Sequence, residues 1–256
     1  METRGRIVVV TGGGGGIGGA LCRRLAVDGA EHVVVSDINS QAAEAVAAEI
    51  GGTAIAADVT VESDVQRLVR GTLEAHGRID IYCSNAGIAF GGGPEASDEA
   101  WRQSWDVHVM AHVYAARALL PGMQERREGY IVGTVSAAGL LNHVLAAPYA
   151  VTKAAGLSFF EWLAIAYHDQ GIRVSALCPQ GVRTAMLAQA GERNFLASGA
   201  LDPDEVATAV AEALRNELFL ILPHPEVGEF FQRKATDYER WLRGMRRLRG
   251  RILEEP

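Results

Sequence analysis

The chain has 256 residues with a formal net charge of −7, 48% hydrophobic residues and 21% charged residues, an ordinary composition for a globular enzyme. The acidic balance argues against nucleic acid as the main partner, and no uncharged run approaches the ~20 residues of a membrane helix. Three cysteines without a C-x-x-C pair argue against a disulfide framework, and no cluster has metal-ligand spacing. We therefore expect a soluble, cytoplasmic protein that binds no metal, nucleic acid or membrane.

The N-terminal segment predicts a phosphate-binding loop. Residues 6–11 (RIVVVT) are a β-branched run typical of a buried strand, and a helix is predicted over 20–28. Between them lie five glycines at 12–16, followed by IGG. A glycine loop in this position lets backbone N–H groups approach a phosphate at the helix N-terminus. The alternative, a flexible glycine linker, fits poorly between two well-patterned elements.

The second predicted strand, 32–36, ends in an acidic residue. Asp37 lies nineteen residues beyond Gly18, where a carboxylate can accept hydrogen bonds from an adenosine ribose. The same carboxylate would repel a 2′-phosphate, which favours NAD over NADP as cofactor. In the alternative interpretation, Asp37 only caps a helix that begins near Ser40.

The rest of the chain continues this alternation of strands and helices. Helices are predicted over 41–50, 61–76, 99–107, 110–125, 148–169 and 203–216, and strands over 53–57, 79–83, 130–135, 172–177 and 218–222. Such alternation is typical of an α/β fold with a doubly wound parallel sheet and helices on both faces. Ligands of that fold gather at the carboxyl ends of the strands. The residues at those ends are Gly12, Asp37, Asp58, Asn85, Ser136 and Cys178-Pro179.

The C-terminal part contains two further segments. Residues 185–200 are irregular and partly apolar, as a mobile lid would be. Residues 225–251 have apolar side chains at intervals of three and four, which predicts one amphipathic helix as a C-terminal extension. Its arginine run could touch an anionic surface, although a solvated face is the simpler interpretation. We see no linker or repeat, so the chain is predicted to be a single domain, 1–256.

The segment 136–153 carries acid–base chemistry. Tyr149 and Lys153 are four residues apart, so a helix would place them on one face, and Ser136 precedes the tyrosine by thirteen residues. A nearby ammonium lowers the pKa of a phenol, which would make Tyr149 a plausible general acid/base. The pair could also be an ordinary surface contact. However, 22 of the 24 basic residues are arginines, whereas this position has a lysine. Because ammonium and guanidinium are not interchangeable, the choice of lysine favours the acid–base interpretation.

Together these stretches resemble the short-chain dehydrogenase/reductase family. The matching motifs are Thr11-Gly12-x-x-x-Gly16-Ile17-Gly18, Asp58-Val59, Asn85-Ala86-Gly87, Ser136, Tyr149-x-x-x-Lys153, and Pro179 to Thr184. They keep their order and spacing over about residues 5–222. The resemblance implies a Rossmann-like sheet of about seven strands, and hydride transfer between a nicotinamide and an alcohol or carbonyl carbon.

The family also implies roles for individual residues. Tyr149 would be the acid/base, Lys153 would lower its pKa and bind the nicotinamide ribose, and Ser136 would orient the substrate oxygen. The residues assigned to the cofactor are Thr11, Gly12, Gly14, Gly15, Gly16, Ile17, Gly18, Asp37, Ile38, Asp58, Val59, Asn85, Ala86, Gly87, Tyr149, Lys153, Pro179, Gly181, Val182 and Thr184. For Asp58 the alternative is that it only terminates its strand.

Two positions depart from the family pattern. His108 stands where the family usually has an asparagine that supports a proton-relay water. We expect either that His108 replaces it in the relay, or that it is a packed helix residue and a backbone carbonyl holds the water. The turn after the sixth strand is Pro179-Gln180-Gly181, with its glycine displaced by one position.

The leading prediction is an NAD-dependent dehydrogenase of an apolar secondary alcohol or ketone. Leucines and a valine between Ser136 and Tyr149 favour a hydrophobic pocket, in which Arg183 and Arg193 are the residues that could meet an anionic substrate. One alternative is an NAD-binding regulatory protein with little turnover, and another is an isomerase or dehydratase on the same fold. The long helices and the apolar face of 230–248 favour a homo-oligomer, either a dimer or a tetramer.

Overall fold

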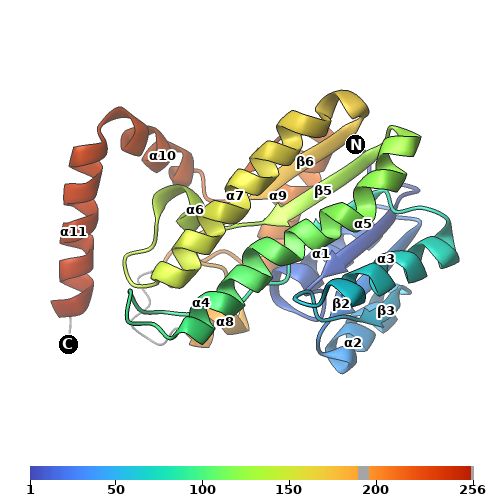
Figure 1. Ribbon diagram of the computed structural model, residues 1–256, viewed down its shortest axis with the longest axis horizontal. Helices are drawn as coiled ribbons and strands as arrows, with labels where there is room; N and C mark the ends of the chain where they lie inside the picture. The colour runs from blue at the N-terminus through green and yellow to red at the C-terminus, as the bar shows by residue number, and fades with distance from the viewer. Residues whose placement is uncertain (190–195, 255–256) are drawn as a thin grey trace.

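Seven parallel strands form one sheet in the order β3-β2-β1-β4-β5-β6-β7 (Figure 1). The computed structural model describes residues 1–189 and 196–254. The strands are β1 (Ile7–Thr11), β2 (His32–Asp37), β3 (Thr53–Ala56), β4 (Ile81–Ser84), β5 (Gly129–Thr134), β6 (Ile172–Leu177) and β7 (Leu220–Ile221). The strand order reverses between β1 and β4, as in a doubly wound fold. The predicted seven-stranded Rossmann-like sheet is therefore confirmed.

Helices follow the strands and cover both faces of the sheet. They are α1 (Gly16–Val27), α2 (Ser40–Ile50), α3 (Glu62–His76), α4 (Asp98–Trp105), α5 (Ala111–Arg126), α6 (Ala137–Leu141), α7 (Ala147–Tyr167), α8 (Ala185–Gln189), α9 (Pro203–Asn216), α10 (Glu226–Thr236) and α11 (Tyr238–Glu254). A π-helical segment, η1 (Asp106–Met110), joins α4 to α5, and a 3-10 turn, η2 (His168–Gln170), follows α7. No helix of the described residues is long and apolar enough to cross a membrane.

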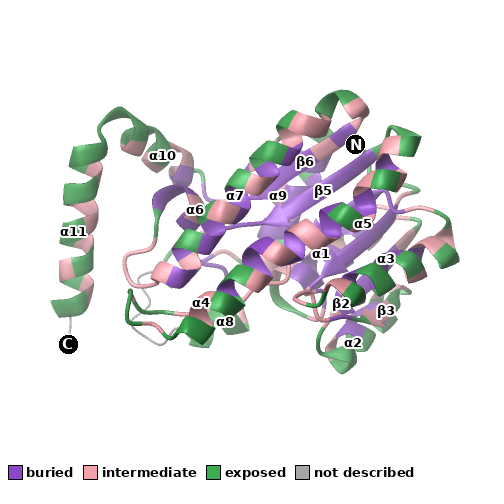
Figure 2. Ribbon diagram, in the orientation of Figure 1, coloured by how far each residue is buried: buried purple, intermediate pink, exposed green. Residues whose placement is uncertain are grey.

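Side-chain alternation along the strands produces two hydrophobic cores, one on each face. The central strands β5 and β6 are coloured almost entirely as buried in Figure 2. On β1, Val9 packs in the core beneath α3, α5 and α7, while Val8 and Val10 pack in the core beneath α1, α2 and α9. All three valines have no exposed surface. A strand buried on both faces must be apolar at every position, which explains the run of β-branched residues in the sequence.

The predicted helices 99–107 and 110–125 form one continuous helical stretch. Instead of a break between them, η1 inserts a wider turn at Asp106–Met110. The backbone N–H of Ala111 then donates to the carbonyl oxygen of Asp106, a spacing of five residues. His108, at the centre of this turn, is 1% exposed.

The prediction of one helix over 225–251 was wrong. The structure has two helices, because the chain is extended at Asp237 between α10 and α11. The Asp237 side chain accepts a hydrogen bond from the backbone N–H of Arg240, which begins a new helix. In Figure 1, α11 stands apart from the body of the molecule, and none of its residues is buried.

Candidate active site

The carboxyl ends of neighbouring strands bring the predicted residues to one edge of the sheet. β1 ends at Thr11, β4 at Ser84 and β5 at Thr134, and these three strands are adjacent and parallel. The segments that follow them therefore start side by side. The glycine loop follows β1 and Asn85 follows β4.

The glycine loop is held in a shape that side chains would disrupt. Gly12 has a left-handed backbone (φ 64°), and a Cβ there would lie 2.9 Å from the Cα of Ala86. A Cβ on Gly18 would overlap the carbonyl oxygen of Gly12. Helix α1 begins at Gly16, while a Cβ on Gly15 would meet no atom within 4 Å. The loop thus presents the open N-terminus of a helix, and Ile17 lies in its first turn.

Asp37 binds the glycine loop directly. Its Oδ2 accepts a hydrogen bond from the backbone N–H of Gly14 at 3.0 Å, and its Oδ1 accepts one from Asn39. The carboxylate is therefore at the end of β2 beside the loop. The helix-cap alternative fails in its simple form, because the side chain that caps α2 is Asn39.

Asn85 connects three strands. Its Nδ2 donates to the carbonyl oxygen of Thr11 at 3.0 Å, and its Oδ1 accepts from the Thr134 hydroxyl at 2.9 Å. The Thr11 hydroxyl accepts from the backbone N–H groups of Asn85 and Ala86. Gly87 follows, and a Cβ there would lie 3.6 Å from Nζ of Lys153. These contacts join the ends of β1, β4 and β5.

Asp58 has a structural role in the described contacts. Its Oδ1 accepts from the backbone N–H and the hydroxyl of Thr60, at 2.9 and 2.7 Å, and so closes a turn after β3. That arrangement fits the alternative that Asp58 terminates its strand. Val59 is half-buried beside it, and Ile38, which was also assigned to the cofactor, is exposed.

Ser136 follows β5 and is 8% exposed. Its hydroxyl caps α6 by accepting from the backbone N–H of Ala138 at 3.1 Å. The same hydroxyl donates to the carbonyl oxygen of Pro179 at 3.5 Å, a long hydrogen bond. Ser136 is therefore placed by α6 and by the turn after β6.

Tyr149 and Lys153 lie in the first two turns of α7, on one face as predicted. Lys153 is 3% exposed, and its ammonium donates to the carbonyl oxygen of Thr134 at 2.9 Å. Nζ is 5.7 Å from the centre of the Tyr149 ring. The Ser136 hydroxyl also acts on the phenol of Tyr149, whose pKa it lowers. The three residues are thus gathered at the end of β5.

The expected effect of Lys153 on the phenol is not found. Burial raises the pKa of Tyr149, and the Ser136 hydroxyl opposes that rise. Burial also lowers the pKa of Lys153 to about 7. The reason is that a dry environment disfavours both charged groups, phenolate and ammonium alike. We correct the sequence argument accordingly: in the protein alone, burial sets the direction of both pKa shifts, and Lys153 does not lower the pKa of Tyr149.

Both ring nitrogens of His108 are hydrogen-bonded within the protein. Nε2 accepts from the backbone N–H of Ile88 at 3.3 Å, and Nδ1 lies 2.8 Å from the Thr152 hydroxyl, which itself donates to the carbonyl oxygen of Pro148. The proton of the neutral ring is therefore on Nδ1. Burial lowers the pKa of His108 most, and the positive charge of Lys153 lowers it further. This geometry favours the packed-residue alternative over a side-chain relay.

The turn after β6 reaches across to the glycine loop. A Cβ on Gly16 would lie 3.2 Å from Cγ2 of Thr184, and Val182 forms a β-bridge with Leu201. The displaced glycine has a steric reason, since a Cβ on Gly181 would overlap the carbonyl oxygen of Leu196. The backbone at Gln180 is not left-handed, so this position does not require glycine. Among the described non-glycine residues, a left-handed backbone is found at Arg127, Asn142 and Glu217.

Four polar residues of the site were not singled out from the sequence. Thr134 accepts a hydrogen bond from Lys153, and Thr152 is hydrogen-bonded to His108. The ring of His143 lies 6.5 Å from that of Tyr149. His224 is buried against the turn after β6. The position of Thr134 at a strand end was a usable signal. His224 offered none, because its contact depends on the pairing of β6 with β7.

Only part of the segment between Ser136 and Tyr149 is available to line the hydrophobic pocket expected from the sequence. Leu140 and Leu141 are buried in the hydrophobic core, and Val144 and Leu145 are the half-buried apolar side chains of this loop. Of the predicted lid, residues 190–195, including Arg193, lie outside the described part of the chain.

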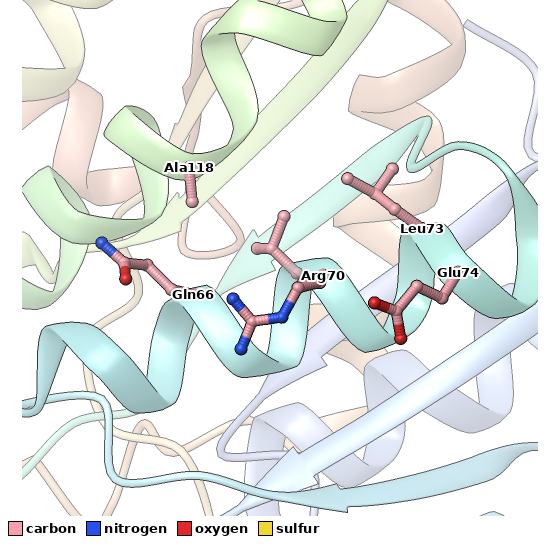
Figure 3. Close-up of a pocket in the computed structure, with 6 residues that line it drawn as sticks. Gln66, Arg70, Leu73, Glu74 and Ala118 are labelled. Carbon is pink, nitrogen blue, oxygen red and sulfur yellow. The ribbon is translucent and has the colours of Figure 1, made fainter.

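Two hollows mark the surface. One, of about 830 Å³, lies beside Gly16 and Thr184 and is also lined by Arg23, Arg183 and Asp202. The other, of about 430 Å³, lies between α3 and α5 (Figure 3). Its lining contains none of the predicted site residues, so we assign it no role. Within residues 1–189 and 196–254, no three His, Cys, Asp or Glu side chains form a possible metal site.

The chain is similar to known proteins in both sequence and fold. The model of the family described as "short chain dehydrogenase" matches residues 6–194. A 2,5-dichloro-2,5-cyclohexadiene-1,4-diol dehydrogenase from Sphingobium indicum is 41% identical over 194 residues, covering 74% of this chain and 77% of the relative. Oxidoreductase UcpA from Salmonella typhimurium is 34% identical over 250 residues, covering 94% and 91%.

The fold has similar counterparts among solved structures. A short-chain dehydrogenase/reductase from Burkholderia phymatum in complex with NAD superimposes with a TM-score of 0.84 and 28% identity, covering 93% of this chain and 96% of that one. A 3-ketoacyl-(acyl-carrier-protein) reductase from Brucella melitensis complexed with NADH gives a TM-score of 0.80 and 30% identity, covering 86% and 96%.

Proposed function

Because this chain belongs to the short-chain dehydrogenase family, we propose that it transfers a hydride between NAD(H) and a secondary alcohol or ketone, with Tyr149 as general acid/base. Membership makes the chain an oxidoreductase acting on CH–OH groups or the matching carbonyls. The observation that carries the finer proposal is the meeting of Ser136, Tyr149 and Lys153 beside the glycine loop.

The phenol of Tyr149 takes the proton of the alcohol in oxidation and returns it in reduction. Ser136 orients the substrate oxygen, because its hydroxyl acts on the same phenol that exchanges the proton. Burial opposes the phenolate, so the proton transfer needs stabilisation from the Lys153 ammonium and from bound ligands.

The glycine loop fits a nicotinamide dinucleotide. Side chains at Gly12 and Gly18 would collide with backbone, and the open N-terminus of α1 suits a pyrophosphate. When bound, the nicotinamide accepts or supplies the hydride. Lys153 uses one N–H on Thr134 and has two more for ribose hydroxyls. We assign Pro179, Gly181, Val182 and Thr184 to the nicotinamide side.

We propose NAD rather than NADP. The carboxylate of Asp37 already accepts from the Gly14 N–H, so it lies where an adenosine ribose meets the loop. A 2′-phosphate there would meet like charge. The solved relatives with NAD and NADH support this choice without deciding it.

For His108 we propose support of the site rather than proton transfer. Its two nitrogens bind Ile88 and Thr152, and its ring packs edge-to-face on Tyr149 at 5.5 Å. The pKa of His108 is lowered, so the ring stays neutral at the pH of the reaction. The relay hypothesis predicts instead that changing His108 alters the pH profile of the rate.

The substrate we propose is an apolar, cyclic secondary alcohol or its ketone. Val144 and Leu145 on the loop before Tyr149 supply apolar surface. The relative from Sphingobium indicum is named for a cyclic diol, which supports a ring-bearing alcohol. An NAD-binding regulator without turnover is the competing proposal.

Self-association also stays a proposal. Side chains of Val151, Trp162 and Ile165 on α7 are 50%, 57% and 83% exposed, which suits contact with a second copy. The mass of the protein in solution, by light scattering, would distinguish a monomer from a dimer or tetramer.

The deciding experiment measures NADH formation from a panel of cyclic secondary alcohols, with NAD and with NADP, for the protein and for Tyr149→Phe. Tyr149→Phe should lower the rate by about a thousandfold, since acid–base catalysis contributes ~10²–10⁴. Tyr167→Phe, at the far end of α7, is the matched control and should keep the rate.

Each other outcome has a separate meaning. Tight NAD binding without turnover of any alcohol or ketone would replace the proposal with the regulatory one. Rearrangement or dehydration of a substrate without net NADH would indicate an isomerase or dehydratase. A preference for NADP would show that Asp37 does not select the cofactor.

A further inference from the structure

The turn after β6 is held from β7 by a histidine. β7 pairs with β6 so that Ile221 lies opposite Leu177, an offset of 44 residues. The same offset brings His224 beside Gln180, and Nδ1 of His224 accepts from the backbone N–H of Gln180 at 3.2 Å. The contact is thus a continuation of the strand pairing, made by a side chain.

The other nitrogen of His224 has no partner within the described part of the chain. His224 is 3% exposed, and no hydrogen-bond partner of Nε2 is found among the described residues. Because Nδ1 accepts a hydrogen bond, the proton of a neutral ring is on Nε2, where a buried donor stays unsatisfied. Such a donor is unfavourable, so a purely packing role would be better served by an apolar ring.

The peptide held by His224 also contacts the catalytic serine. Its N–H belongs to Gln180 and its carbonyl oxygen to Pro179. That oxygen accepts from the backbone N–H of Ala137 at 2.8 Å and from the Ser136 hydroxyl at 3.5 Å. One planar peptide unit therefore connects His224 to Ser136, and rotating it would move the acceptor of the Ser136 hydroxyl.

We infer that His224 is a positioning residue of the active site, which holds the Pro179–Gln180 peptide and through it the Ser136 hydroxyl. The inference rests on the proposed function for its kinetic consequence only.

The test compares His224→Phe with His224→Asn, in the parent and in Ser136→Ala. Phe keeps the ring without an acceptor, whereas the Asn amide oxygen can accept near the position of Nδ1. We expect His224→Phe to lower kcat/KM for the alcohol about tenfold, and His224→Asn to restore most of it. In the Ser136→Ala background, His224→Phe should cost less than about twofold, because the group it positions is gone.

A second measurement does not need turnover. Hydrogen exchange of the Gln180 amide should be slow in the parent and in His224→Asn, and faster in His224→Phe. Unchanged exchange, or equal losses with and without Ser136, would overturn the inference. If the parent has no dehydrogenase activity, the proposed function fails, and amide exchange still decides whether His224 holds the peptide. If His224→Phe does not fold, His224→Leu is measured in its place.

Discussion

The two lysines of this chain make the same kind of contact in two different regions. Lys153 at the strand ends donates to the carbonyl oxygen of Thr134, and Lys234 on α10 donates to that of Leu140. The first is buried among the ends of β1, β4 and β5, and burial lowers its pKa to about 7. The second is half-buried on the C-terminal arm, which we define as α10 and α11.

The surroundings decide what each contact can do. At the strand ends, Asn85, Thr11 and Thr134 bind one another across three strands, so moving one group disturbs the others. The arm is attached to the core through the apolar side chains of Val227, Phe230 and Trp241. Its polar contacts include Lys234 and Arg249, and the Arg249 side chain donates to the carbonyl oxygen of Val144. We expect changes at the strand ends to alter chemistry and pH dependence, and changes on the arm to alter substrate binding.

The largest effect is predicted for Lys153→Met. Activity should fall by at least about a hundredfold, because the ammonium at the site is lost. The folded protein should nevertheless become more stable near pH 6, by about 1–4 kcal/mol, since a buried charge is replaced by an apolar chain. Because the folded-state pKa of Lys153 is lowered from its ordinary 10.5 to about 7, the parent gains stability as pH rises through that interval.

Lys153→Met would therefore lose its advantage between pH 7 and pH 10. Urea unfolding at several pH values tests this, with Lys234→Met as the matched control, for which we expect activity within a few-fold of the parent. A stability advantage that persists unchanged to pH 10 would contradict the lowered pKa of Lys153.

Smaller effects are predicted for the two buried histidines behind the strand ends. Burial lowers the pKa of His108, and that of His112 to about 3. Below pH 6.5, the ordinary pKa of histidine, the unfolded chain binds protons that the folded protein does not. The free energy of unfolding therefore decreases as the pH is lowered. Each histidine should contribute a slope of about 1.4 kcal/mol per pH unit.

His108→Asn and His112→Asn should each remove one such contribution between pH 6 and pH 4, in urea unfolding. All variants should share the parent's pH dependence above pH 7, which serves as the internal control. If the free energy of unfolding of both variants decreased below pH 6 as steeply as that of the parent, these rings would be protonated in the folded state.

A still smaller effect is predicted for shortening the arm by removal of 237–256. No residue of α11 is fully buried, but Trp241 packs partly buried against the core, so the free energy of unfolding should fall by about 1–3 kcal/mol. KM for the alcohol should rise a few-fold, as the Arg249 contact with the loop before Tyr149 is lost. Arg249→Met should reproduce the rise and Arg243→Met should not. A loss well above that range would show that the arm belongs to the folding core.

The smallest effect is predicted for Gln180→Gly. Since the backbone of Gln180 is not left-handed, glycine relieves no strain, and the rate should stay within about twofold with a stability loss of about 0.5–1 kcal/mol. Gly181→Ala is the contrast, because its Cβ would overlap the carbonyl oxygen of Leu196. Thermal unfolding compares the two; equal stability would contradict the steric reason for the displaced glycine.

The sheet was predictable because its causes are local. The valines at 8–10 must be apolar on both faces, and a glycine run after such a strand has few other uses. The spacing of Tyr149 and Lys153 is set by the geometry of one helix, so the sequence placed them on one face. The break at Asp237 was missed because the apolar spacing continues across it, although Asp is a common residue at a helix start.

The amino-acid sequence by itself thus determined the alternation of strands and helices, the glycine loop, and the helix face that Tyr149 and Lys153 share, since each depends on neighbouring residues or on one periodicity. Only the tertiary structure decided the pKa shifts of Tyr149 and Lys153, because their burial depends on helices far apart in the chain. It also decided that His108 uses both nitrogens on the protein, and that His224 meets the turn beside Ser136. Desolvation, and side-chain hydrogen bonds between segments far apart in the chain, produce no regular spacing of residue types, so they cannot be predicted from a sequence pattern.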